Sequence, residues 1–142
     1  MPDLPSFPYH RDPLASGSLR GSTDPCQCCG RTRGILYDGV VYSREEITAL
    51  CPWCIADGSA AEKFDASFFD ADFCDTEGNP VALPPEVHHE VFDCTIGFAT
   101  FNPIGWWVHC DEPAEYVLRV EPYDLVFQCR VCGKKHVIED VD

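Results

Sequence analysis

Long apolar runs are missing from this chain. None of its 142 residues lie in a stretch approaching the roughly 20 apolar residues that a membrane helix needs. The first residues, MPDLPSFPYHRDPLASGS, have neither the basic start nor the apolar centre of a secretory signal peptide. We therefore expect a cytoplasmic protein with no membrane contact.

Basic residues are scarce, above all in the middle of the chain. The sequence has 10 Lys and Arg against 24 Asp and Glu, a net charge of −14. Between residues 57 and 124, fifteen acidic residues accompany only two basic ones, Lys63 and Arg119. Nucleic-acid binding needs a basic surface, so we expect no direct nucleic-acid contact. The acidity is compatible with a basic protein partner or simply with a soluble acidic face.

Familiar catalytic motifs are also absent. There is no H-E-x-x-H helix, no G-x-S-x-G turn and no phosphate-binding loop. Pro25-Cys26-x-x-Cys29 matches half of the zinc-deaminase pattern, but His88-His89-Glu90 follows it instead of preceding it. We therefore predict that the protein is not an enzyme.

Cysteine, by contrast, is abundant. Ten cysteines are present, and six of them form the C-x-x-C pairs Cys26/Cys29, Cys51/Cys54 and Cys129/Cys132. In a reducing cytoplasm, paired cysteines bind metal more often than they bind each other. Disulfides are the alternative, and we favour metal.

The first two pairs have the spacing C-x2-C-x21-C-x2-C, which is typical of a zinc ribbon or treble clef. Cys26, Cys29, Cys51 and Cys54 are therefore predicted to form a closed, structural Zn²⁺ site. Cys28 could replace Cys26 or Cys29, or could be a free thiol.

The third pair, Cys129 and Cys132, has no partner pair in the sequence. Cys110 is the best third ligand, because it ends an apolar segment with strand composition. The fourth could be His109, Cys94 or His136. Neighbouring residues on a strand point to opposite faces, which counts against using both His109 and Cys110. A second zinc site is therefore possible, and a buried thiol cluster is its alternative.

The pattern of elements predicts one small, zinc-stabilised α+β domain with knuckle hairpins at both ends. It would consist of an extended arm (1–24), an N-terminal zinc module (25–64), and an acidic loop followed by a C-terminal C-x-x-C module (65–142). We expect a hairpin over 34–42, helices over 43–50, 57–64 and 85–92, and strands over 116–120, 125–129 and 137–138. Residues 65–80 should form a partly exposed loop.

Two segments carry a resemblance to a known family. They are LPSFPYHRDPL at residues 4–14 and LCPWCIADGSAAEKF at residues 50–64. With the Cys-x-x-Cys-Gly motifs and Trp106-Trp107, they resemble the CbrC family of bacterial proteins, strongly over 4–64 and more loosely over 97–134. Residues 100–105 depart from that family by lacking its Trp-Gln-Gln stretch.

The resemblance implies a role in tolerance of a DNase-type colicin. It also implies that the family cysteine pattern falls on Cys26, Cys29, Cys51, Cys54, Cys110, Cys129 and Cys132. We therefore predict a protein-binding module that acts as an immunity protein by neutralising a basic, nuclease-type toxin. The alternatives are a zinc- or thiol-dependent enzyme and a zinc-ribbon regulatory module.

The acidic middle of the chain is the candidate partner surface. Phe68 and Phe69 would supply its apolar anchor. Its charges would speed association with a basic partner. The acidic residues predicted to make this contact are Asp65, Asp70, Asp72, Asp75, Glu77 and Glu90.

Overall fold

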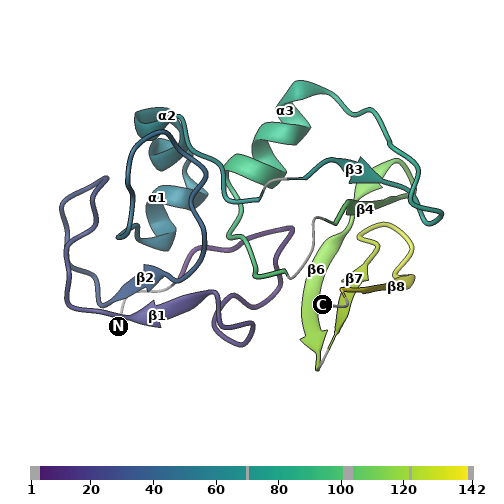
Figure 1. Ribbon diagram of the computed structural model, residues 1–142, viewed down its shortest axis with the longest axis horizontal. Coiled ribbons are helices and arrows are strands. Elements are labelled where there is room, and N and C mark those ends of the chain that lie inside the picture. The colour runs from purple at the N-terminus through teal and green to yellow at the C-terminus, as the bar shows by residue number, and fades with distance from the viewer. Residues whose placement is uncertain (1–3, 70, 101–103, 122, 141–142) are drawn as a thin grey trace.

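The computed structural model describes residues 4–69, 71–100, 104–121 and 123–140. These residues form short helices and three small sheets, which confirms the α+β fold class. In Figure 1, strands β1 and β2 and helices α1 and α2 lie on one side of the molecule, while strands β3, β4 and β6–β8 lie on the other.

The N-terminal half is built around a two-stranded sheet. Strand β1 (Leu19–Gly21) pairs antiparallel with β2 (Ile35–Tyr37), and helices α1 (Pro52–Ala56) and α2 (Ser59–Phe64) follow. The helix expected over 57–64 is confirmed as α2. The hairpin expected within residues 34–42 is wrong, because the partner of β2 is the upstream arm and not residues 40–42.

The helix expected over 43–50 is also wrong, since this segment is bent and then extended. The backbone groups that a helix would pair internally are used elsewhere. Gln27 Oε1 accepts hydrogen bonds from the N–H groups of Thr48 (2.7 Å) and Ala49 (2.8 Å). The carbonyl of Leu50 accepts one from Tyr37 N–H at 2.7 Å. Long-range bonds have therefore overridden the local helix signal.

The C-terminal half contains two three-stranded sheets. Strand β3 (Phe73–Cys74) runs parallel to β4 (Trp106–His109), which forms a hairpin with β5 (Glu112–Pro113). Strands β6 (Glu115–Val120), β7 (Asp124–Gln128) and β8 (Lys135–Glu139) form an antiparallel meander. The three strands predicted here are confirmed.

The helix expected over 85–92 is confirmed, but its second half is a π-helix. Helix α3 (Pro85–His88) continues directly as a π-helix, η1 (His89–Asp93). A π-helix bonds residue i to i+5, and such turns are uncommon and frequent at functional sites. Here it buries Val91 and Phe92.

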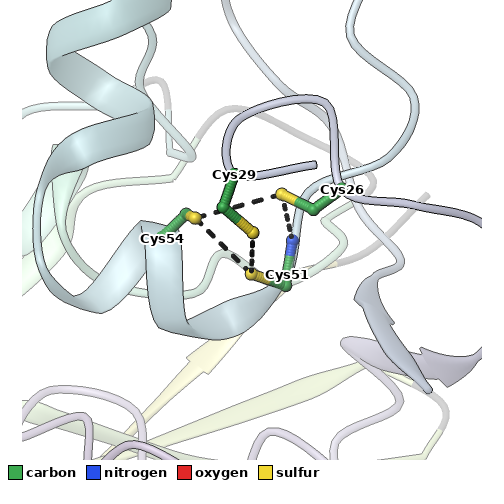
Figure 2. A group of neighbouring side chains, drawn as sticks. All are labelled: Cys26, Cys29, Cys51 and Cys54. Atoms are coloured by element: carbon green, nitrogen blue, oxygen red, sulfur yellow. Dashed lines mark hydrogen bonds between the residues drawn. The ribbon is translucent and has the colours of Figure 1, made fainter. Parts of the chain in front are cut away.

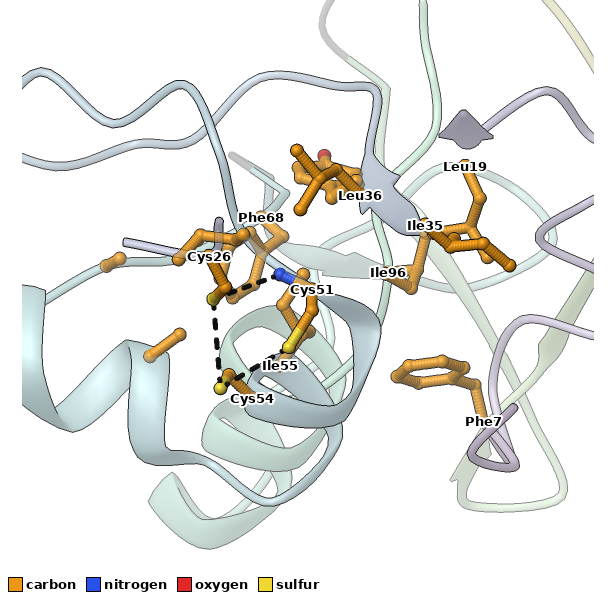
Figure 3. Packing of buried hydrophobic residues seen from close by; sticks show 14 residues of the cluster. Phe7, Leu19, Cys26, Ile35, Leu36, Cys51, Cys54, Ile55, Phe68 and Ile96 are labelled. Atoms are coloured by element: carbon orange, nitrogen blue, oxygen red, sulfur yellow. Dashed lines mark hydrogen bonds between the residues drawn. The ribbon is translucent and has the colours of Figure 1, made fainter. Parts of the chain in front are cut away.

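Within the part of the chain that the structure describes, buried side chains form two clusters, one for each half. The first contains Phe68 with Ile35, Leu36 and Ile55, and the cysteine sulfurs lie beside them (Figure 3). The second contains Phe69 and the fully buried Trp106 and Trp107. Phe68 is 2% exposed and Phe69 is 8% exposed. The prediction that they form an exposed anchor is wrong, because their rings supply core that this small protein needs.

The arm joins the two clusters. Phe7 is buried in the first and Tyr9 in the second. His10 lies between them, fully buried, and forms an isolated parallel bridge with Tyr116 of β6. Among the described residues, no helix has the length and apolar character needed to cross a membrane.

Candidate metal centres

The first centre combines a loop and a helix start. Cys26 and Cys29 come from the turn after β1, while Cys51 and Cys54 come from the first turn of α1 (Figure 2). Pro52 occupies the first position of that helix, where its missing N–H costs nothing. The C-P-W-C sequence therefore starts the helix and directs both thiols to one point.

The sulfur separations fit one tetrahedral metal ion. They are 3.9 Å for Cys26–Cys54, 3.9 Å for Cys29–Cys51 and 3.5 Å for Cys51–Cys54. All four sulfurs lie within 4.8 Å of one another. Four sulfurs about 2.3 Å from a zinc ion would be about 3.8 Å apart. All ten cysteines are free thiols, so no disulfide competes for these four.

Backbone amides stabilise negative charge at this centre. The N–H groups of Cys28 and Cys51 each donate to Cys26 Sγ at 3.3 Å. Burial alone would raise the pKa of Cys26, but these bonds, with a further one from Cys29 N–H, lower it to about 7. Burial raises the pKa of Cys51 to about 11. A metal ion would therefore have to displace a proton from a thiol with a raised pKa, such as Cys51, when it binds.

The second centre brings together His109, Cys110, Cys129 and Cys132, whose ligand atoms lie within 4.8 Å. Cys129 and Cys132 belong to the turn between β7 and β8, and His109 ends β4. His109 Nδ1 lies 3.3 Å from Cys110 Sγ and 3.4 Å from Cys132 Sγ. The meander and the β4–β5 hairpin together position these four ligands.

Adjacent His109 and Cys110 both face this centre, contrary to the argument from strand alternation. Cys110 is not on the strand. Cys110 and Asp111 form a two-residue turn with φ of 56° and 59°, a left-handed conformation that is rare outside glycine. The turn rotates the Cys110 thiol back towards the imidazole.

Cys129 has the same amide pattern as Cys26. The N–H groups of Val131 (3.4 Å) and Cys132 (3.5 Å) donate to its sulfur. Burial would raise the pKa of Cys129, but these donors and the neighbouring His109 lower it to about 6. At each centre, the first cysteine of a C-x-x-C motif is therefore favoured in its thiolate form.

The two centres differ in exposure. Cys26, Cys51 and Cys54 are buried within the first core, whereas Cys110 and Cys132 are exposed. Two other candidate ligands lie apart from the second centre. Cys94 contacts His89 instead, and His136 stacks on Trp107 at 4.9 Å.

Comparison with known proteins places these centres in a family. A family model described as an uncharacterised protein family, UPF0167, matches residues 4–126. The chain belongs to the UPF0167 family. The match includes the whole first centre with His109 and Cys110, and it ends before Cys129.

Two UPF0167 proteins illustrate the likeness. The protein of Pseudomonas aeruginosa is 44% identical over 117 residues, which is 81% of this chain and 63% of that protein. The protein of Mycobacterium bovis is 42% identical over 115 residues, which is 80% of this chain and 59% of that protein. The match therefore spans about three fifths of the length of these UPF0167 relatives. No solved structure matches the chain significantly.

The predicted partner residues are only partly brought together. Asp72, Asp75 and Glu77 line one hollow of about 640 Å³, along with Val137 and Ile138 of β8. Asp65 follows α2, and Glu90 lies on η1; both are exposed, and neither lines this hollow. Asp70 lies outside the described residues.

Proposed function

We propose that the protein is a zinc-stabilised protein-binding module with a structural Zn²⁺ ion at each centre. The observation that carries this is the convergence of four donors within 4.8 Å at two separate places. Thiolate and imidazole donors suit zinc, and four protein ligands leave no open position for water. The first centre, with four cysteines, and the second, with one histidine and three cysteines, would each link segments distant in sequence.

The partner we propose is a basic protein, and most concretely a nuclease-type toxin. Support comes from the concentration of acidic residues between 57 and 124 and from the CbrC resemblance. We place the proposed contact at the hollow lined by Asp72, Asp75 and Glu77. Val137 is 51% exposed at its edge, and it replaces the buried Phe68 and Phe69 as the apolar contact.

Metal analysis of the purified protein tests the first half of the proposal. We expect close to two zinc ions per chain, with the ligand thiols unreactive until a chelator is added. One zinc ion per chain would remove the second centre from the proposal. A chain that folds without any bound metal would overturn it.

Binding measurements with a basic nuclease domain test the second half. The association rate should fall steeply as salt rises from about 50 to 300 mM, because screening weakens long-range steering. The double variant D72K/E77K should slow association at least tenfold at low salt. The double variant E45K/E46K, which reverses two exposed charges outside the acidic region, is the matched control. Equal effects of the two double variants, or a rate insensitive to salt, would contradict this surface.

A further inference from the structure

A third group of reactive side chains lies outside both metal centres. Cys94 Sγ lies 3.4 Å from His89 Nε2, and His89 Nδ1 lies 2.9 Å from Asp93 Oδ2. The thiol and the carboxylate thus contact opposite nitrogens of one imidazole. This order of thiol, imidazole and carboxylate is that of a nucleophile, its base and the group that orients the base.

The π-helix is what makes this arrangement possible. In an α-helix, Asp93 would lie beside His89, at i and i+4, but Cys94 would point away. In η1 the wider backbone turn instead bonds i to i+5. Just beyond this helix, the Thr95 hydroxyl also contacts a group five residues back, donating from Oγ1 to the Glu90 carbonyl at 2.8 Å. His89 therefore has one neighbour at i+4 and another at i+5, and its ring connects them.

The group does not have the geometry of a metal site. With Nδ1–H donating to Asp93, Nε2 is left to accept a hydrogen bond from the Cys94 thiol. The three side chains form a line, whereas the ligands of both metal centres surround a common point. Proton transfer along the line is the chemistry that such an arrangement serves.

The surroundings leave this group accessible. Gly58 lies over the contact between thiol and imidazole, where a Cβ would come to 3.5 Å from Cys94 Sγ and 3.9 Å from His89 Nε2. The His89 side chain is 56% exposed. An open hollow of about 460 Å³, with Leu83, Phe69 and Phe92 in its lining, borders the same imidazole. The lining includes His89 and Asp93 but not Cys94. An apolar reagent in this hollow therefore contacts the imidazole, and it would have to reach the half-buried Cys94 sulfur at the edge of the ring.

We infer that Cys94 is an acyl-accepting thiol, with His89 as its base and Asp93 as a positioning residue, and that its reagent is an activated thioester. The sulfur of Cys94 attacks the thioester carbonyl carbon, and His89 Nε2 takes the thiol proton. The bond to the leaving sulfur breaks, and the proton passes to that sulfur. The products are S-acylated Cys94 and a free thiol, so no oxidant or further reactant is needed.

Cys74 is a built-in control for this reaction. It is half-buried like Cys94, and burial followed by Asp75 raises its pKa. Burial also raises the pKa of Cys94, and three carboxylates act in the same direction: Asp93, Glu90 and Asp57. The pKa values of both thiols are therefore raised, and ionisation alone predicts fast acetylation at neither. Faster acetylation at Cys94 than at Cys74 would therefore have to result from proton removal by His89.

The test treats the metal-loaded protein with S-phenyl thioacetate and follows acetylation of each cysteine by peptide mass spectrometry. We expect Cys94 to react at least tenfold faster than Cys74, and His89→Gln to remove the difference. His88→Gln, a change in the neighbouring histidine, should leave it intact. Equal rates at Cys94 and Cys74 in the wild-type protein would overturn the inference, as would an undiminished rate in His89→Gln.

Asp93→Asn separates positioning from simple charge. Removing this carboxylate lowers the pKa of Cys94, so a purely electrostatic role would speed acetylation when its rate is followed against pH. We expect the rate to fall at least threefold instead, because the imidazole loses the acceptor that orients it. An unchanged or faster reaction would exclude Asp93 from the group.

Discussion

Cys54 illustrates how much a single side chain can depend on a metal ion. It is 5% exposed, lies in the first core and belongs to the four-sulfur cluster. Cys54→Ser should reduce the zinc content by one ion per chain and lower the unfolding free energy by about 4 kcal/mol or more, since a structural ligand is lost. Metal analysis with denaturant unfolding measures both.

Cys28 is the matched control for Cys54. It lies two residues from Cys26, yet its sulfur contacts Ser59 Oγ at 3.6 Å and is outside the cluster. Cys28→Ser should leave the zinc content unchanged and shift the unfolding free energy by less than about 1 kcal/mol. A loss of zinc in this variant would mean that Cys28, in place of Cys26 or Cys29, is a ligand.

His10 makes stability depend on pH. It is fully buried, with Nδ1–H donating to the Ile96 carbonyl at 2.8 Å and Nε2 contacting Ser16 Oγ at 2.8 Å. Burial lowers its pKa from 6.5 to about 4, so the unfolded chain binds this proton first as pH falls. This residue's contribution is complete above pH 6.5, and about 3 kcal/mol of it is lost between pH 6.5 and 4.

Comparison with His10→Gln isolates that contribution. Protonation of the metal ligands weakens both proteins at low pH, so it cancels in the difference between their unfolding free energies. We expect this difference to shrink by about 3 kcal/mol from pH 7 to 4 in favour of the variant. A difference that is constant with pH would show that His10 is not held neutral.

At the scale of elements, the β4–β5 turn places a ligand at a conformational cost. Asp111 has φ of 59°, which glycine adopts freely and a β-branched residue does not. Asp111→Gly should raise the unfolding free energy by about 0.5 kcal/mol or leave it unchanged, whereas Asp111→Val should lower it by about 1–2 kcal/mol. Thermal unfolding of the zinc-loaded proteins measures this. Equal stability of the two variants would contradict the turn geometry.

The same turn shows where sequence-based prediction fails. The C-x-x-C pairs were predictable because each is a local motif whose geometry depends on four residues. The joint use of His109 and Cys110 was not, since it depends on a left-handed turn at two residues that are not glycine. The π-helix was likewise unforeseen: an ordinary helix was predicted over 85–92, and the i+5 contact from His89 to Cys94 has no familiar sequence signal.

Pairing over longer distances explains the errors in the N-terminal half. Asp38-Gly39 predicts a tight turn, yet β2 pairs with Leu19–Gly21 of the arm. Ser43 Oγ accepts a hydrogen bond from Glu45 N–H at 3.2 Å, as a helix cap would, but the hydroxyl also donates to the Phe64 carbonyl at 2.8 Å, and no helix follows. Both local signals lost to contacts that only the assembled structure provides, whereas the meander β6–β8 was predictable because its strands are consecutive.

At the scale of the whole molecule, two cores share one arm, and each core contains part of one metal centre. Cys26, Cys51 and Cys54 belong to the first core and Cys129 to the second. The arm contributes Phe7 to one core and Tyr9 to the other, while Arg11 forms an ion pair with Glu115 at 2.6 Å. The halves should therefore be coupled, with metal loss in one half felt in the other through the arm.

The exposure of the two centres determines the order in which they lose metal. Two ligands of the second centre, Cys110 and Cys132, are exposed, whereas only Cys29 is exposed in the first. A chelator should therefore remove zinc in two phases, the faster one from the second centre, when release is followed with a metal-sensitive dye. Cys132→Ser should abolish the fast phase and preserve the slow one, and Cys74→Ser should keep both. A fast phase that persists in Cys132→Ser would assign rapid release to the first centre and contradict the protection that its buried sulfurs provide.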